Sequence, residues 1–261
     1  MTAAVRRLAG ATAVVAAVAC MPVTAVGTTG TASAATTGTS TSTSTSTTVT
    51  VARWKLDEPY GATVAHDASG HHHDGSIGTA VRPGVRGYYD TAFRFTPPST
   101  NVNDPQHLVR VPDAPGLDPG WKIMHISLRI RTGYTGHFNI VQKGQAATPG
   151  GFWKVQMDDG YPSCVFLGVT TSGDRVTAAV KYGKRVNNGV WHHIVCDKYR
   201  YSIRLRVDGS SPAVTYKRVG HIDNTWALVM GGKVSCHPDT SWVGCDYYRG
   251  DLDSVILSMS S

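Results

Sequence analysis

Carboxylates are the first residues whose spacing could do chemistry, because hydrolysis of a sugar chain needs two of them. The chain holds a single glutamate, Glu58, so no mechanism that requires two glutamates is possible. Asp251 and Asp253 are two residues apart, and on a strand they would share one face with a separation of about 6.6 Å. That spacing lies at the low end for inverting glycosidases. A polysaccharide hydrolase or lyase is therefore one alternative function.

Histidines are the second candidates. His66 and the run His71–His73 resemble a transition-metal cluster in composition, but consecutive loop residues cannot all point at one ion. We interpret them as a solvated turn. No Gly-x-Ser-x-Gly elbow occurs in the sequence, so a serine nucleophile of that type is not supported.

The cysteines predict structural disulfide bonds rather than a catalytic role. Cys20 lies near the N-terminus, and the other four are Cys164, Cys196, Cys236 and Cys245. In an exported chain, four cysteines indicate two disulfides with three possible pairings. A local Cys236–Cys245 bridge is the simplest, which leaves Cys164 to pair with Cys196 across strands. Because no C-x-x-C is present, a zinc ribbon or a thioredoxin-type site is not supported.

Aromatic and basic residues are the candidates for ligand binding. Trp242 lies inside the predicted Cys236–Cys245 loop, and Tyr247 and Tyr248 follow it. Rings on a stapled loop suit stacking on sugars, although packing within the loop is the alternative. Arg204 and Arg206 belong to a basic segment, residues 175–206, and would share a solvent face. They could attract an anionic polymer, although an ordinary charged sheet surface is the alternative.

The elements that must position these residues are strands. Apolar and polar residues alternate along residues 126–131, 203–207, 153–157 and 93–95, the period of a half-buried strand. Turn dipeptides such as Asp159-Gly160 and Asn188-Gly189 separate such runs. Many short strands of this kind predict an all-β sandwich or barrel, and the scarcity of helix-forming residues agrees.

The N-terminus predicts export. Residues 1–34 have Arg6 and Arg7, an apolar run and a small-x-small cleavage site, as in a secretory signal peptide. Removing them lowers the formal charge from +7 to +5. Residues 35–48 form a Ser/Thr-rich linker, and residues 49–261 form one domain. Lipid anchoring through Cys20 is the alternative to free secretion.

Several segments resemble laminin G-like, concanavalin A-like domains, and they occur in the order of that family. The matching segments are Val51–Glu58, Ala65–Gly70, Asp74-Gly75, Ala92–Phe95, Val109–Pro112, Trp191–Cys196, Leu205–Gly209 and Gly250–Leu257. The resemblance implies a jelly-roll sandwich of two antiparallel sheets, with Trp54 and Trp191 in its core. The run His71–His73 and the Cys236–Cys245 insert depart from the family pattern.

The resemblance also implies a structural calcium ion. Relatives bind calcium where the first loop meets the last strand, and the matching residues here are Asp67 and Asp253. Calcium takes about six to eight oxygen ligands. The alternative is that Asp67 only caps its own turn.

These observations together predict a secreted, non-catalytic, monomeric binding module for an extracellular glycan or an anionic envelope polymer. We expect no nucleic-acid partner and no membrane span. The alternatives are a hydrolase or lyase of the same fold, and a protein-interaction or structural envelope domain.

Overall fold

The computed structural model describes residues 47–99, 102–236 and 245–260. The predicted signal peptide, Cys20, most of the predicted linker and Trp242 lie outside these residues. None of the helices within the described residues has the length and apolar character needed to cross a membrane.

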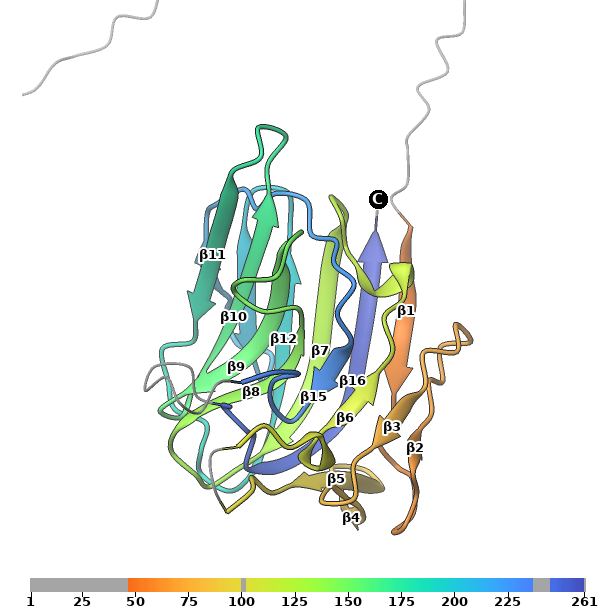
Figure 1. The fold of residues 1–261 in the computed structure, drawn as a ribbon. Helices are drawn as coiled ribbons and strands as arrows, with labels where there is room; N and C mark the ends of the chain where they lie inside the picture. Colours follow the sequence, from red (N-terminus) through yellow and green to blue (C-terminus); the bar gives the residue numbers. More distant parts are fainter. Residues whose placement is uncertain (1–46, 100–101, 237–244, 261) are drawn as a thin grey trace, which may run out of the picture. The chain divides into compact units, whose positions relative to one another are not determined.

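Two eight-stranded sheets make up the described domain, and their paired strands are antiparallel (Figure 1). In the first, called sheet 1, the order is β14-β13-β12-β7-β16-β5-β4, and β1 also pairs with β16. Its strands are β14 (Ala213–Thr215), β13 (Ile203–Val207), β12 (Trp191–Lys198), β7 (Ile123–Arg131), β16 (Gly250–Ser260), β5 (Thr91–Phe95), β4 (Arg82–Arg86) and β1 (Thr48–Trp54).

The second sheet, called sheet 2, has the order β11-β10-β9-β8-β15-β6-β3-β2. Its strands are β11 (Arg175–Lys181), β10 (Tyr161–Val169), β9 (Phe152–Asp158), β8 (His137–Lys143), β15 (Leu228–Met230), β6 (Val109–Val111), β3 (Gly75–Ile77) and β2 (Val64–Ala65). The helical elements among the described residues are two short 3-10 turns, η1 (Pro105–His107) and η2 (Pro115–Leu117).

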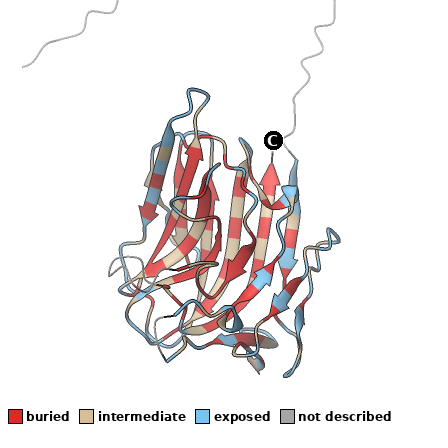
Figure 2. Cartoon of the chain, in the orientation of Figure 1, coloured by how far each residue is buried: buried red, intermediate tan, exposed pale blue. Residues whose placement is uncertain are grey.

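Alternation along the strands explains why the sheets stack. On β7, Met124, Ile126, Leu128 and Ile130 are buried, and the residues between them are half-buried. Figure 2 shows this alternation of buried and intermediate residues along the strands. The inward side chains of both sheets meet in one apolar core, because each sheet buries one face against the other. The predicted all-β jelly-roll sandwich is confirmed.

Both predicted disulfides are present. Cys164 on β10 bonds to Cys196 on β12, so this bridge joins sheet 2 to sheet 1 through the core. Cys236 bonds to Cys245 and closes a short loop. Spacing alone was sufficient to select the observed pairing from the three possibilities.

Two tryptophans were expected in the core, and for one of them the structure shows that this prediction is wrong. Trp54 is fully buried. Trp191, however, is half-buried on the outer face of sheet 1, with the Arg131 guanidinium 4.8 Å from its ring centroid. Trp191 pairs with Arg131 across the strands, which places both side chains on the face turned away from the core.

Candidate functional site

The aromatic residues predicted to stack on a ligand need correction. Tyr248 is fully buried, and its hydroxyl donates to the carbonyl of Asp251 over 3.0 Å. Tyr247 is 6 % exposed, and its hydroxyl bonds to the backbone of Asp104. Neither ring has a face free for a sugar. Trp242, the third member of the predicted platform, lies outside the described residues.

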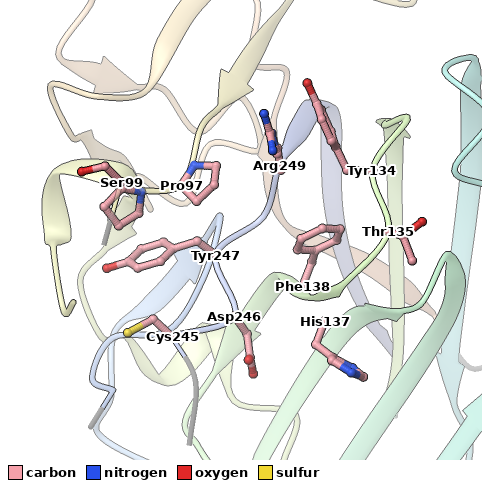
Figure 3. Close-up of a pocket in the computed structure, with 11 residues that line it drawn as sticks. Pro97, Ser99, Tyr134, Thr135, His137, Phe138, Cys245, Asp246, Tyr247 and Arg249 are labelled. Carbon is pink, nitrogen blue, oxygen red and sulfur yellow. The ribbon is translucent and has the colours of Figure 1, made fainter. Parts of the chain in front are cut away.

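A surface hollow of about 450 Å³ lies beside Tyr247. Figure 3 shows Tyr134 and Arg249 on one side of it and Asp246 and His137 on the other. The guanidinium carbon of Arg249 lies 3.7 Å from the centroid of the Tyr134 ring. Because Arg249 covers one face of this exposed ring, Tyr134 offers only its other face to a ligand.

The two arginines predicted to bind an anion are partly engaged by the protein itself. Arg206 donates to the buried Asp197 carboxylate over 2.7 Å. The guanidinium of Arg204 lies 4.6 Å from the centroid of the Tyr199 ring. Since Asp197 neutralises Arg206, this part of the sheet attracts anions less than its sequence suggests.

Asp251 and Asp253 do share a face of β16, as their spacing predicts, but each has a structural partner. Asp251 accepts from Arg94 and Arg131, each over 2.7 Å at the closest. Asp253 accepts from the backbone N–H of Tyr88 over 2.9 Å and from the Ser254 hydroxyl. Burial raises the pKa of Asp253. Because the Asp251 carboxylate is bound by two guanidiniums and that of Asp253 by its neighbours, neither is free to act on a substrate, and the pair does not resemble a glycosidase site.

Asp67 is occupied by its own loop. Its carboxylate accepts from the backbone N–H groups of Arg53, Ser69 and His73 and from the Ser69 hydroxyl, over 2.8 to 3.0 Å. Partial burial acts to raise the pKa of Asp67, but these hydrogen bonds lower it overall. The carboxylates of Asp67 and Asp253 thus have partners within the protein, and they fit structural roles better than a shared calcium site. Calcium binding stays a prediction.

The histidine-rich loop contains no recognisable metal site. In the described part of the chain, no group of three or more His, Cys, Asp or Glu residues could hold a metal ion. The rings of His71 and His73 stack with their centroids 6.2 Å apart, and His71 and His72 are exposed. These placements agree with a solvated turn.

A groove that the sequence did not predict lies on the outer face of sheet 2. We call it the Trp226 groove, and its volume is about 480 Å³. Its apolar wall consists of Ala146, Ala147, Pro149, Phe152 and Trp226. Its polar residues are Gln142, Gln145, Thr148, Lys154, Lys233 and Ser235.

Strand register explains the polar floor of the Trp226 groove. Gln142 on β8 pairs with Lys154 on β9, and Val141 and Val155 beside them face the core. Gln142 is only 2 % exposed, yet its Nε2 has no hydrogen-bond partner among the described residues. Such a buried donor is costly to leave unpaired. Lys154 donates to Asn139 over 3.2 Å, and burial, followed by the charge of Lys233, lowers the pKa of Lys154.

Asn224 holds Trp226 in position. Its side-chain oxygen accepts from the Trp226 backbone N–H over 3.0 Å, and its amide nitrogen donates to Gly151 over 3.1 Å. The backbone carbonyl of Asn224 accepts from the buried Lys143. The backbone that carries the Trp226 ring is therefore held in place before a ligand arrives, which favours binding.

The loop between β8 and β9 forms the opposite wall. Gly150 has a φ of +78°, and a Cβ there would lie 1.7 Å from the Asp223 carbonyl oxygen, so only glycine allows this close approach. Arg175 on β11 donates to the carbonyls of Thr148 and Ala146 over 2.9 and 2.6 Å. This member of the basic segment therefore secures the loop.

Comparison with known proteins finds a family match over part of the chain. Residues 140–258 match the family model of the laminin G domain. Comparison with curated proteins gives no match. The resemblance predicted from the sequence motifs is confirmed for the segment 140–258, which is similar to a laminin G domain.

Solved structures give the same fold. Domain 4 of AbnA, an extracellular arabinanase from Geobacillus stearothermophilus solved in complex with arabinotriose, has a TM-score of 0.57 and 14% identity, with 81% of this chain and 93% of that chain covered. The binding domain of Paraclostridial Mosquitocidal Protein 1 has a TM-score of 0.55 and 14% identity, with 80% and 48% covered. The binding domain of botulinum neurotoxin serotype G has a TM-score of 0.55 and 10% identity, with 80% and 47% covered.

The chain spans about half the length of the two toxin binding domains it matches. At these identities the likeness shows the fold alone, because one fold serves many functions. Function has to be argued from the site.

Proposed function

We propose that this protein is an extracellular, non-catalytic module that binds polysaccharide through the Trp226 groove. The observation that carries the proposal is the pairing of a half-exposed tryptophan ring with a buried, unpartnered amide in one groove. The ring supplies a flat apolar surface for the C–H face of a sugar. The Gln142 amide supplies donors for a hydroxyl oxygen.

Other features of the Trp226 groove suit the same ligand class. Binding sites for small polar ligands combine apolar walls with a few well-placed polar groups, and Gln145, Lys154 and Ser235 add such groups. The fold also occurs in an arabinanase domain solved with arabinotriose, which makes arabino-oligosaccharides the first ligands to test.

The proposed location rests on the disulfides. Two of them join the four cysteines of the domain, and such bonds persist in oxidising compartments. The signal peptide predicted for residues 1–34 agrees with export to the cell exterior.

Titration calorimetry with a panel of neutral oligosaccharides that includes arabinotriose tests the proposal. We expect Trp226→Ala to weaken the best ligand at least tenfold, since stacking and its desolvation are lost. Tyr216→Ala is the control, because Tyr216 is an exposed aromatic residue outside the groove.

Gln142→Leu is a second variant with a distinctive signature. It removes the unpaired amide while keeping a similar volume, so it should weaken sugar binding yet leave stability unchanged or higher. Binding that is equal in wild type and Trp226→Ala would overturn the proposal. So would a panel without any ligand, and the protein-interaction alternative would then gain support.

A further inference from the structure

A second hollow, unlike the Trp226 groove, has a basic lining. Its volume is about 400 Å³, and it lies where β7 begins and β12 ends. We call it the basic hollow, and it is lined by Trp121, Lys122, Lys198, Arg200 and Arg218 together with apolar neighbours. Four cations therefore surround one cavity, and none of its lining residues is acidic.

Lys198 is the central observation. It is 2 % exposed, and its ammonium donates to the backbone carbonyl of Lys122 over 2.9 Å. An ammonium has three donors, and burying a charge is costly unless it is paired. Among the described residues, no carboxylate forms an ion pair with Lys198.

Lys143 provides an internal comparison. It is also fully buried, but its ammonium lies 2.8 Å from Asp113 and 2.8 Å from Asp118. The same protein thus neutralises one buried lysine with two carboxylates and leaves the other facing a cavity without any.

The arginines of the basic hollow also have no carboxylate partner within the described ranges. The guanidinium of Arg218 lies 5.5 Å from the centroid of the Trp121 ring, and that of Arg200 lies 5.3 Å from the centroid of the Tyr201 ring. Contacts with aromatic faces leave the hydrogen-bond donors of a guanidinium available.

We propose that the basic hollow binds an anionic group, a phosphate, sulfate or carboxylate, carried by an extracellular polysaccharide. Lys198 supplies the buried charge, and Arg200 and Arg218 supply directional donors to the anionic oxygens. The Trp121 ring, 45 % exposed, offers a surface for the sugar that carries the group. This site goes beyond the Trp226 groove, and its ligand class differs.

Inorganic phosphate and inorganic sulfate are the first probes, measured by the melting temperature of the mature chain in a neutral, low-salt buffer. A ligand that binds only the folded state raises the melting temperature. We expect a rise in wild type, its loss in Lys198→Met, and a smaller rise in Arg218→Gln, because this variant loses one guanidinium but keeps Arg200 and the buried Lys198. Lys181→Met is the charge-matched control on β11 and should keep the full rise.

A second experiment, with charged polymers, identifies which kind of polymer carries the anionic group. A sulfated polysaccharide, a polyuronate, a sugar-phosphate polymer and a duplex DNA of matched charge are compared by calorimetry. We expect Lys198→Met to weaken at least one anionic polysaccharide about tenfold or more, while Trp226→Ala leaves that affinity within twofold. The neutral oligosaccharides should show the reverse pattern, so failure of one site is distinguishable from failure of the other.

Three results would overturn the proposal. The first is a phosphate and sulfate response that is absent, or that is equal in wild type and Lys198→Met. The second is a response that Lys181→Met loses to the same extent, because it would reflect overall charge. The third is DNA binding as tight as that of every polysaccharide and equally dependent on Lys198, which would assign the basic hollow to nucleic acid.

Discussion

Lys198 shows at the scale of one residue how burial without a counter-ion changes a side chain. Burial lowers the pKa of Lys198 from its usual 10.5 to about 8. Between these two values the unfolded chain holds a proton that the folded protein has released. The free energy of unfolding therefore rises with pH in this window.

This linkage gives a measurable prediction. Below pH 8 the buried ammonium destabilises the fold, so Lys198→Met should be more stable than wild type. From pH 8 to about 10.5 this advantage should shrink by up to about 1.4 kcal/mol for each pH unit. Urea denaturation of both proteins in phosphate-free buffer measures it.

Subtracting the two proteins removes the titration of all other groups, because they are shared. Lys181→Met controls for the loss of one positive charge. A difference between wild type and Lys198→Met that is constant from pH 7 to 10.5 would contradict a buried, uncompensated ammonium.

Single residues also show where sequence reasoning was sufficient. The cysteine spacing selected the correct pairs, because the short loop of eight residues between Cys236 and Cys245 closes easily. Tyr247 and Tyr248 could not be placed, since they precede β16 in an irregular segment where no alternation indicates which side chains face inward. The role of Gln142 in the Trp226 groove was not predicted either, because it depends on the absence of a hydrogen-bond partner for its side-chain amide.

At the scale of elements, the β8–β9 loop illustrates how a binding surface depends on distant strands. Its carbonyls at Ala146 and Thr148 are held by Arg175, which comes from β11. The strand runs at residues 126–131, 153–157 and 203–207 were predicted from alternation and correspond to β7, β9 and β13. The loop was not predicted, since its position results from side-chain contacts and a glycine turn.

Arg175→Met should weaken oligosaccharide binding in the Trp226 groove by about three- to tenfold, because two hydrogen bonds to the loop are lost. Arg175→Lys should not restore the affinity, since one ammonium does not reproduce the guanidinium fork. Calorimetry with the best neutral ligand measures both variants. Full affinity in Arg175→Met would show that the loop needs no such support, and full rescue by lysine would show that charge alone matters.

At the scale of the whole molecule, the Cys164–Cys196 bridge ties the two sheets together. Replacing both cysteines by alanine should lower the free energy of unfolding by about 3–4 kcal/mol, as expected for closing a loop of this length. Removing the short Cys236–Cys245 bridge should cost less, about 2–3 kcal/mol. Urea denaturation of wild type and of the two double cysteine variants measures these losses. An equal loss of unfolding free energy in both variants would contradict the loop-length argument.

The position of β16 has a consequence for the timing of folding. This strand, residues 250–260, pairs with β7, β5 and β1, so it lies in the middle of sheet 1 although it follows the other strands of that sheet in sequence. A growing polypeptide that lacks β16 has nothing to join β5 to β7, so sheet 1 cannot close until residues 250–260 have been made. Pairings between such distant segments are also slow to form. Sheet 1 is thus expected to be completed by a strand that arrives after its other strands, so its two parts, β4-β5 and β7-β12-β13-β14, have to wait for their central partner.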